Sequence, residues 1–134
     1  MKLYIYEHCP FCSRVLYIAR KLGVNLEEVV VGYDDVETPT TLIGKKKVPI
    51  LVKDNGEVMA ESGDIITCLL DIKMSNEVRT PSKQALDWQS RAFYTLIRIG
   101  YPRWSQFKLE EFSTKESRAA WIERKQSDTM FCIR

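Results

Sequence analysis

The first half of the chain alternates between strand-like and helix-like patterns. Lys2–Tyr6 is short, apolar and rich in aromatic residues, and Leu26–Val31 ends in three consecutive valines, so both are predicted strands. Between them, from about Phe11 to Leu22, apolar residues recur at helical spacing, and Gly23 follows as a stop signal. A right-handed crossover would make the two strands parallel. The apolar face of the predicted helix carries Phe11, Val15, Ile18, Ala19 and Leu22.

A short helix and a hairpin are predicted next. Thr38 is a suitable helix cap and Pro39 a suitable first helical residue, so this helix should extend to about Ile43. Val48–Lys53 and Glu57–Ala60 flank an Asp-Asn-Gly sequence, which favours a tight turn between antiparallel strands.

A third helix completes the first half. Ser62 is expected to cap it, with Ile65, Leu69 and Ile72 on one face. The predicted order over residues 1–72 is β-α-β-α-β-β-α, which packs as an α/β layer structure. We expect these residues to form one domain.

The pattern changes after residue 72. Lys73–Ser82 is polar, contains a Thr-Pro pair and is predicted to be a linker. Residues 83–99 are predicted to form a mostly buried helix that Gly100 and Pro102 end. Its broad apolar surface carries Ala85, Leu86, Trp88, Ala92, Phe93, Leu96, Ile97 and Ile99.

Residues 83–134 are predicted to form an incomplete helical domain. Ser113–Glu116 matches a capping box, and the helix that it opens should extend to about Gln126. The chain then stops at Met130–Arg134, although two helices with wide apolar surfaces normally need further partners. We therefore expect exposed apolar surface, favouring dimerisation or aggregation, around Leu96, Trp104, Trp121 and Phe131.

Composition narrows the function classes. With 134 residues, 45% hydrophobic and 28% charged, the chain has the length of about one globular unit and needs no disulfide or metal to fold. No apolar run reaches the roughly 18 residues of a membrane span, and we see no secretory signal, so we expect a cytoplasmic protein without a membrane partner.

The net charge of +2 is too small to predict nucleic-acid binding. Residues 1–72 carry 8 basic and 11 acidic side chains, whereas residues 73–134 carry 12 and 7, which is consistent with two modules.

The strongest chemical signal is Cys9-x-x-Cys12, between a predicted strand and a predicted helix. The nucleophile of thiol–disulfide exchange is a thiolate, and the N–H groups of a helix N-terminus stabilise that anion. Cys9 lies just before the helix, while Cys12 lies one turn inside, close enough to attack a mixed disulfide on Cys9. The spacing predicts a redox pair, with Cys9 as an exposed attacking thiol and Cys12 as a sheltered resolving thiol. Pro10 stiffens the loop between them.

A zinc site is the alternative interpretation of this cysteine pair. Zinc would need two more ligands, and the other candidates are His8, Cys68 and Cys132. Cys68 falls within a predicted helix beside Leu69 and is expected to be a core thiol. His8 could favour the Cys9 thiolate when protonated, but a loop histidine is commonly neutral. We predict a redox pair and no bound metal.

Two further positions have ligand-binding potential. Pro49 could simply begin an edge strand, or a cis-proline there could expose the Val48 backbone to an extended, peptide-like substrate. At Glu61-Ser62 a strand gives way to a helix, so helix-start N–H groups could bind a ligand carboxylate while Glu61 binds an ammonium group. The zwitterionic end of an amino acid would suit both. The basic run Lys45–Lys47 could attract a second carboxylate or be solvated.

Four segments of this sequence closely resemble the glutaredoxins. They are Tyr6–Cys12, with the sequence Tyr-Glu-His-Cys-Pro-Phe-Cys, followed by Glu37–Thr40, Lys47–Leu51 and Glu61–Ile65. The similarity is greatest to the two-domain, glutathione-transferase-like bacterial glutaredoxin 2 family, and it continues in Tyr101–Arg103 and Glu111–Thr114. Members of that family continue through several more helices. We therefore interpret this chain as C-terminally truncated, through a shortened or frameshifted gene or as a fragment.

The resemblance implies a thioredoxin-like N-terminal α/β domain followed by a partial all-α, glutathione-transferase-like domain. It also implies glutathione as co-substrate and reductant, bound by Pro10, Phe11, Val48, cis-Pro49, Glu61 and Ser62. Val48 and Pro49 would pair with the cysteinyl backbone of glutathione. Glu61 and Ser62 would bind its γ-glutamyl end.

Three functions remain open on this basis. The first is a glutathione-dependent oxidoreductase in which Cys9 and Cys12 reduce protein disulfides and glutathionylated proteins. The second is a glutathione transferase-like enzyme, in which glutathione itself attacks an electrophile held by a complete helical domain. The third is a non-catalytic scaffold or metal–sulfur carrier that bridges two chains through Cys9. The intact cysteine pair favours the first.

Overall fold

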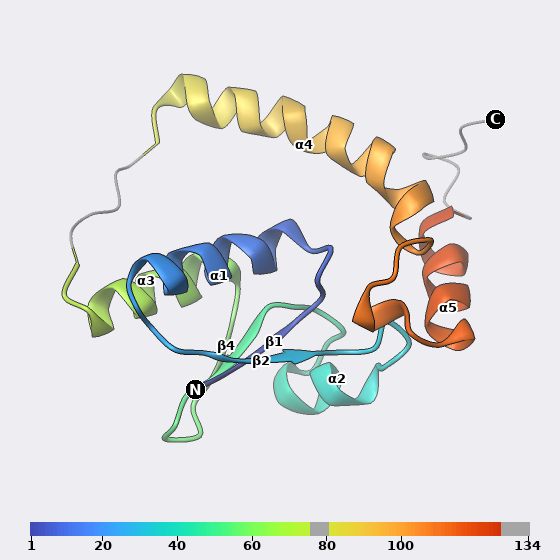
Figure 1. Ribbon diagram of the computed structural model, residues 1–134. Helices are drawn as coiled ribbons and strands as arrows, with labels where there is room; N and C mark the ends of the chain where they lie inside the picture. Colours follow the sequence, from blue (N-terminus) through green and yellow to red (C-terminus); the bar gives the residue numbers. More distant parts are fainter. Residues whose placement is uncertain (76–80, 127–134) are drawn as a thin grey trace.

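A four-stranded mixed β-sheet lies at the centre of the N-terminal half of the molecule (Figure 1). The computed structural model describes residues 1–75 and 81–126. β1 and β2 are parallel, whereas β3 is antiparallel to both β1 and β4, as the predicted crossover and hairpin require. In the spatial order β2-β1-β3-β4, the strands are β1 (Lys2–Ile5), β2 (Glu27–Val30), β3 (Ile50–Val52) and β4 (Val58–Ala60).

Helices cover both faces of this sheet. They are α1 (Pro10–Lys21), α2 (Glu37–Ile43) and α3 (Ser62–Ile72). α1 and α3 pack side by side on one face, and α2 lies on the other (Figure 1). Burial of apolar side chains between the layers is the main stabilising term of such a fold. The core formed by the sheet, α1 and α3 includes Leu3, Ile5, Val15, Ala19, Leu51, Ile65 and Leu69.

Among the described residues, the C-terminal part contains helices and no strands. It comprises α4 (Lys83–Trp104), the 3₁₀ turn η1 (Glu110–Phe112) and α5 (Lys115–Gln126). Phe112 of η1 and Trp121 of α5 are buried and belong to the same hydrophobic core as the sheet. η1 also bonds to the segments that follow β1 and β2, so it packs against the edge of the sheet where the proposed redox loop begins.

Two predicted helix caps are wrong. The side chain of Thr38 does not cap α2, because the helix already begins at Glu37. The Thr38 backbone N–H donates to Asp35 Oδ1 at 2.9 Å. Ser62 is the first residue of α3 rather than its cap, and its hydroxyl accepts hydrogen bonds from Arg14. Glu61 is the cap residue, with a left-handed φ of 68°. The Arg14 guanidinium competes for the Ser62 oxygen across the fold, which a local cap pattern does not reveal.

The capping box of α5 lies one residue later than predicted. Thr114 Oγ1 accepts the Ser117 N–H at 3.0 Å, and Ser117 Oγ accepts the Thr114 N–H at 3.3 Å. Ser117 is buried, and its short hydroxyl side chain lies close to the backbone, where it also donates to the Thr114 carbonyl at 3.0 Å. The predicted partners, Ser113 and Glu116, are both exposed.

α4 continues through both residues that were expected to end it. The Trp104 indole lies against the backbone of Gly100, where a Cβ atom would collide with the ring. Gly100 therefore allows the Trp104 ring to pack closely and does not end the helix. Pro102 lies in the last turn of α4. There the Arg103 guanidinium donates to the Ile99 carbonyl at 2.8 Å and satisfies one carbonyl near the helix end.

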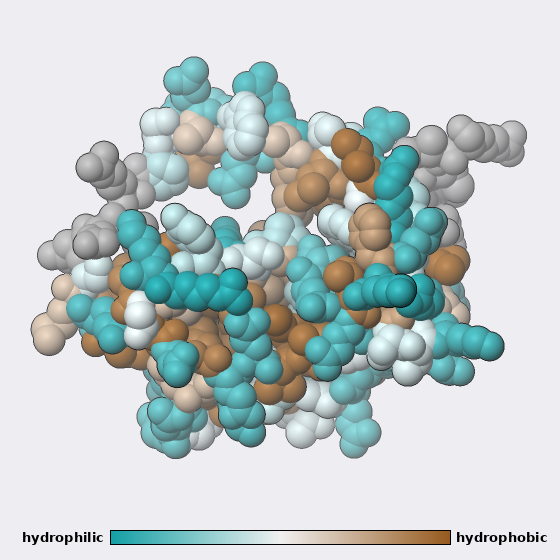
Figure 2. Space-filling model, viewed as in Figure 1, coloured by the Kyte–Doolittle hydropathy of each residue, from teal (hydrophilic) through white to brown (hydrophobic). Residues whose placement is uncertain are grey.

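α4 is largely exposed, which contradicts the predicted burial. The first turns of α4 stand away from α1 and α3, with open space between them (Figure 2). The expected exposure is confirmed for Leu96, at 44%, but it is wrong for Trp121, which is 1% exposed. Trp104 is half-buried, and Phe131 lies outside the described residues. The exposed apolar side chains of α4 are Leu86, Trp88, Tyr94, Leu96 and Ile99.

Two predicted apolar faces also need correction at one residue each. Cys12, and not Phe11, accompanies Val15 on the buried face of α1. Phe11 is 42% exposed and contacts Phe93 of α4, with ring centroids 5.5 Å apart. Ile72 at the end of α3 is exposed. α1 is therefore turned so that the second cysteine faces the core.

Part of the predicted linker and of the C-terminal segment lies outside the described residues. α3 ends at Ile72, and α4 begins after Ser82, whose hydroxyl accepts the Ala85 N–H at 3.2 Å. Residues 76–80 and 127–134, which include Met130–Arg134, are not described. The domain boundaries 1–72, 73–82 and 83–134 stay predictions. Among the helices that the structure describes, none is long and apolar enough to span a bilayer.

Phe112 provides a test of the contact between η1 and the core. Replacing Phe112 by alanine should lower the free energy of unfolding by about 3–5 kcal/mol, because a fully buried ring is removed. The matched control is Phe107→Ala, since Phe107 is half exposed and its loss should cost less than about 0.5 kcal/mol. Urea unfolding of the two variants gives the comparison, and equal stabilities would contradict the packing described.

Candidate active site

Cys9 and Cys12 lie at the N-terminus of α1. Cys9 is the cap residue, with an extended backbone, and Pro10 is the first helical residue. The exposed fraction is 8% for Cys9 and 1% for Cys12. Cys12 is therefore sheltered as predicted, whereas the expectation of an exposed Cys9 is wrong. Cys9 instead borders a pocket through which a ligand would reach it.

The two thiols have opposite pKa shifts. A hydrogen bond from the Cys12 thiol lowers the pKa of Cys9 to about 7, and the backbone N–H groups of Cys12 and Phe11 add to this effect. Burial and the negative charge of Glu111 oppose it. The same hydrogen bond, together with burial, raises the pKa of Cys12 far above its ordinary value. Near neutral pH, a substantial fraction of Cys9 is thus thiolate, whereas Cys12 keeps its proton.

His8, immediately before Cys9, is paired with a buried carboxylate. Glu111 Oε1 accepts hydrogen bonds from the His8 backbone N–H at 3.1 Å and lies 2.7 Å from His8 Nδ1. The Glu111 residue is 0% exposed, and the His8 side chain is 8% exposed. Burial alone would raise the pKa of Glu111, but the bonds from His8 outweigh it and the pKa is lowered. His8 is therefore a buried side chain paired with Glu111 and not an isolated loop histidine.

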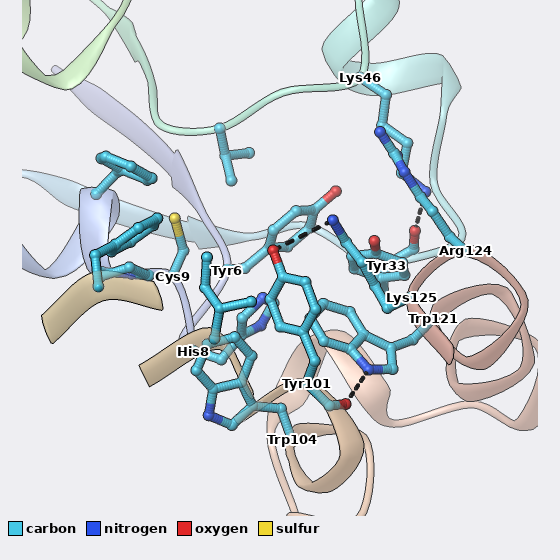
Figure 3. A pocket seen from close by; sticks show the side chains of 15 residues that line it. Tyr6, His8, Cys9, Tyr33, Lys46, Tyr101, Trp104, Trp121, Arg124 and Lys125 are labelled. Carbon is cyan, nitrogen blue, oxygen red and sulfur yellow. Dashed lines mark hydrogen bonds between the residues drawn. The ribbon is translucent and has the colours of Figure 1, made fainter. Parts of the chain in front are cut away.

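Aromatic rings surround the His8 imidazole. It stacks on Tyr6, with centroids 5.6 Å apart, and on Phe112, at 5.5 Å. Trp121 meets it edge-on at 4.8 Å, and Trp104 lies 5.0 Å away (Figure 3). These contacts fix the orientation of the ring and exclude water from the Glu111 carboxylate.

The Val48–Pro49 peptide bond is cis, which confirms the predicted isomer. Val48 and Pro49 precede β3 and are both buried. Val48 lines the same pocket as Cys9, although 39 positions separate them in the sequence. The structure therefore brings the predicted proline loop to the predicted cysteine loop.

Glu61 and Ser62 form the start of α3, away from the lining of that pocket. Glu61 is exposed and forms an ion pair with Lys47, whose hydrogen bond lowers the pKa of the carboxyl. Lys45 lies 3.9 Å from the same carboxylate. Lys46 instead donates to the Tyr33 carbonyl. The three lysines thus do not act as one group: two face Glu61 and one faces the Cys9 pocket.

The pocket beside Cys9 has a volume of about 170 Å³ (Figure 3). Four predicted site residues line it, namely Cys9, Pro10, Phe11 and Val48. Its other walls come from residues without a predicted role, including Tyr6, Tyr33, Tyr101, Trp104, Trp121 and Arg124. Tyr101 and Glu111 lie in segments that carried the family resemblance, so that resemblance was the available signal for them.

The third described thiol is not a core residue. Cys68 on α3 is half-buried and lines a separate depression with Lys53 and Asp71. Cys132 lies outside the described residues. Within residues 1–75 and 81–126, no three His, Cys, Asp or Glu side chains are grouped as metal ligands.

The sequence is similar to that of known proteins. Residues 3–77 match the family model described as the glutathione S-transferase N-terminal domain. The chain is 35% identical to glutaredoxin 2 of Escherichia coli strain K12 over 130 residues, which is 95% of this chain and 60% of that protein. It therefore spans about 60% of the length of the curated relatives that it matches.

Solved structures show the same relationship. Glutaredoxin 2 from Salmonella typhimurium, in complex with glutathione, has a TM-score of 0.89 and 32% identity, covering 96% of this chain and 59% of that chain. A sphingomonad glutathione S-transferase complexed with glutathione has a TM-score of 0.53 and 22% identity, covering 94% and 65%, and shows a shared fold alone. The predicted fold class, a thioredoxin-like sheet followed by glutathione-transferase-like helices, is confirmed.

The hydrogen bond between the two thiols predicts how Cys9 titrates. In Cys12→Ala the donor is lost, so the pKa of Cys9 should rise from about 7 toward 9. Cys12→Ser is the matched control, because a hydroxyl still donates and the rise should be smaller. The ultraviolet absorbance of the thiolate, followed against pH, measures both. If Cys9 titrated at the same pH in Cys12→Ala as in the unaltered chain, the assigned cause would be wrong.

The buried Glu111 carboxylate predicts a large stability effect. Glu111→Ala removes the acceptor of two His8 N–H groups and should lower the free energy of unfolding by about 3 kcal/mol. Glu111→Gln keeps an acceptor oxygen and should lose less. The neighbouring Glu110 is exposed, so Glu110→Ala is the control and should change stability by less than about 0.5 kcal/mol. Chemical unfolding ranks the three variants, and a Glu111→Ala chain as stable as Glu110→Ala would refute the pairing.

Proposed function

Because this chain belongs to the family of glutathione S-transferase N-terminal domains and is similar to glutaredoxin 2 along nearly all of its length, we propose that it is a glutathione-dependent thiol–disulfide oxidoreductase. Its proposed catalytic residues are Cys9 and Cys12. The proposed substrates are protein disulfides and glutathionylated proteins.

The observation that carries this proposal is that two adjacent thiols have opposite pKa shifts. Cys9, with a pKa of about 7, is substantially ionised at neutral pH and is therefore nucleophilic. Cys12 is buried beside it and protonated, so it does not compete for the substrate. An attacking thiol with a pKa near the ambient pH has the favourable combination of thiolate fraction and nucleophilicity.

The proposed reaction proceeds by two exchanges. The Cys9 thiolate attacks the glutathione sulfur of a mixed disulfide, forms a Cys9–glutathione disulfide and releases the substrate thiolate, which takes up a proton. Glutathione thiolate then attacks that glutathione sulfur, giving oxidised glutathione and the free Cys9 thiolate. With a protein disulfide, Cys12 instead resolves the Cys9–protein disulfide after losing its proton. Two glutathione molecules then reduce the Cys9–Cys12 disulfide.

Glutathione is proposed to bind along one path from α1 to α3. The Val48 backbone before cis-Pro49 is suited to pairing with the cysteinyl unit of glutathione, and Pro10 and Phe11 line the same pocket. The first N–H groups of α3, at Ser62, would bind the γ-glutamyl carboxylate, because the N-terminus of a helix attracts anions. Glu61 would bind the ammonium group. The ion pair between Lys47 and Glu61 is exposed, so it can exchange partners at low cost.

Glutathione conjugation is the alternative for this fold. In that reaction the thiolate of glutathione attacks, and Cys9 is not required. The lowered pKa of Cys9 favours the oxidoreductase, because a conjugating enzyme gains nothing from a protein thiolate at this position. Turnover of an aromatic electrophile by a Cys9→Ser chain would support conjugation.

The central test is reduction of a glutathione mixed disulfide by the purified chain. Cys9→Ser should abolish turnover, because a hydroxyl is not ionised near pH 7. Cys12→Ser should keep much of the activity, because glutathione itself can resolve the Cys9–glutathione disulfide. Turnover is followed by coupling oxidised glutathione formation to its reductase.

Cys68→Ser is the control for a general thiol effect. Cys68 is half-buried on α3, outside the lining of the Cys9 pocket, and its replacement should leave turnover within about twofold of the unaltered chain. Retained activity in Cys9→Ser would overturn the assignment of the attacking thiol.

A further inference from the structure

The pocket beside Cys9 has a cationic end. Lys46 reaches it from the loop after α2, and Arg124 and Lys125 reach it from the last turn of α5 (Figure 3). Lys46 Nζ lies 4.4 Å from the centroid of the Tyr33 ring, and Lys125 Nζ lies 3.4 Å from the Tyr101 hydroxyl. Three positive side chains from two distant segments therefore converge on one small space.

Tyr6 places an unused hydroxyl in the same pocket. The residue is 7% exposed and lines the pocket, and its hydroxyl has no hydrogen-bond partner among the described residues. Tyr33 and Arg124, which also line the pocket, act electrostatically on this hydroxyl, as does Asp35. A buried hydroxyl without a partner costs free energy unless a ligand or water bonds to it. Its position indicates where an acceptor atom of a ligand would lie.

Nearby acidic groups reduce the positive charge but do not cancel it. Asp34 and Asp35 raise the pKa of Lys46. Burial and the charge of Arg124 act in the opposite direction, and the net effect is a lowered pKa. Glu111, the buried acid of η1, is bonded to His8 and does not line the pocket. Cationic groups that repel one another in a partly desolvated site are stabilised when an anion binds between them.

The rest of the lining is largely aromatic and apolar. It includes the indole rings of Trp104 and Trp121, with Phe93 and Ile97 of α4. With a volume of about 170 Å³, the pocket suits a single small ring system better than a folded peptide loop. Cys9 also belongs to the lining, so a molecule in this space is in reach of the sulfur.

We propose that this pocket binds the departing thiol of the substrate and selects one that is aromatic or otherwise apolar and carries a carboxylate. The inference rests on the proposed function and adds the class of substrate. The Cys9 thiolate attacks the glutathione sulfur of the mixed disulfide and forms a Cys9–glutathione disulfide. The original disulfide bond breaks, and the substrate sulfur leaves as a thiolate with the electron pair. The carboxylate of that thiol lies at the end formed by Arg124, Lys125 and Tyr6.

Two matched substrates test the proposal. They are the mixed disulfides of glutathione with 4-mercaptobenzoate and with 4-mercaptobenzamide, which have nearly the same shape and differ by one charge. The unaltered chain should show a KM about tenfold lower for the carboxylate, because one charge-assisted hydrogen bond is worth about that factor. Equal KM values for the two substrates would overturn the proposal.

Variants of the cationic end should remove this preference. In Arg124→Gln/Lys125→Gln the ratio of the two KM values should fall to about one. Tyr6→Phe deletes a hydroxyl that has no protein partner, so the chain should fold normally while the ratio falls about threefold. Lys115→Gln, at an exposed position on the same helix, is the control and should keep the full ratio. Loss of the ratio in Lys115→Gln as well would indicate a general charge effect and overturn the proposal.

Glutathione carries carboxylates of its own, which gives a further outcome. If the KM for glutathione rises in Arg124→Gln/Lys125→Gln as much as the KM for the carboxylate substrate, the cations serve glutathione, and the proposal is wrong. Failure of the proposed function is recognised separately, because neither disulfide would then be turned over in a Cys9-dependent way. A non-reactive analogue, 4-(methylthio)benzoate, still reports on the pocket in that case by quenching the fluorescence of Trp104 and Trp121.

Discussion

The candidate active site depends on one buried carboxylate. Glu111 is fully enclosed, and a charge in that position is tolerated only where it is hydrogen-bonded. Its partners are the backbone and side chain of His8, while its own backbone carbonyl accepts the Tyr33 N–H at 2.9 Å. A single residue of η1 thus joins the loop after β1 to the loop after β2. Cys9 follows His8 directly, so this network fixes the start of the redox loop.

The pKa of Cys9 results from effects that act in opposite directions. The Cys12 proton and the N–H groups of α1 favour the thiolate, whereas burial and the Glu111 charge disfavour it. The pKa of about 7 is the balance of these effects, and the Cys12 hydrogen bond makes the largest contribution. The helix N-terminus, which the sequence pattern emphasised, contributes less. Because the Cys12 thiol donates a hydrogen bond to the Cys9 sulfur, replacing Cys12 changes the pKa of Cys9, the proposed nucleophile.

The order and type of the elements could be predicted from the sequence because both arise from local patterns. Alternation of short apolar runs with helical periodicity, and the Asp-Asn-Gly turn, identified the sheet and its three N-terminal helices. The errors arose where a distant contact overrides a local pattern. Arg14 takes the Ser62 hydroxyl, and the Trp104 ring occupies the space that Gly100 leaves. The Glu111–His8 pair joins residues 103 positions apart and has no local signature, so sequence patterns did not reveal it.

That separation has a consequence for the newly made chain. Translation delivers the cysteine pair early, and the sheet that supports it is complete by about residue 60. The carboxylate that fixes the residue before Cys9 emerges from the ribosome only after a further long stretch has been added. During synthesis the sulfur is therefore present before its surroundings are in place, and the nascent polypeptide passes through an interval in which its reactivity differs from that of the finished molecule.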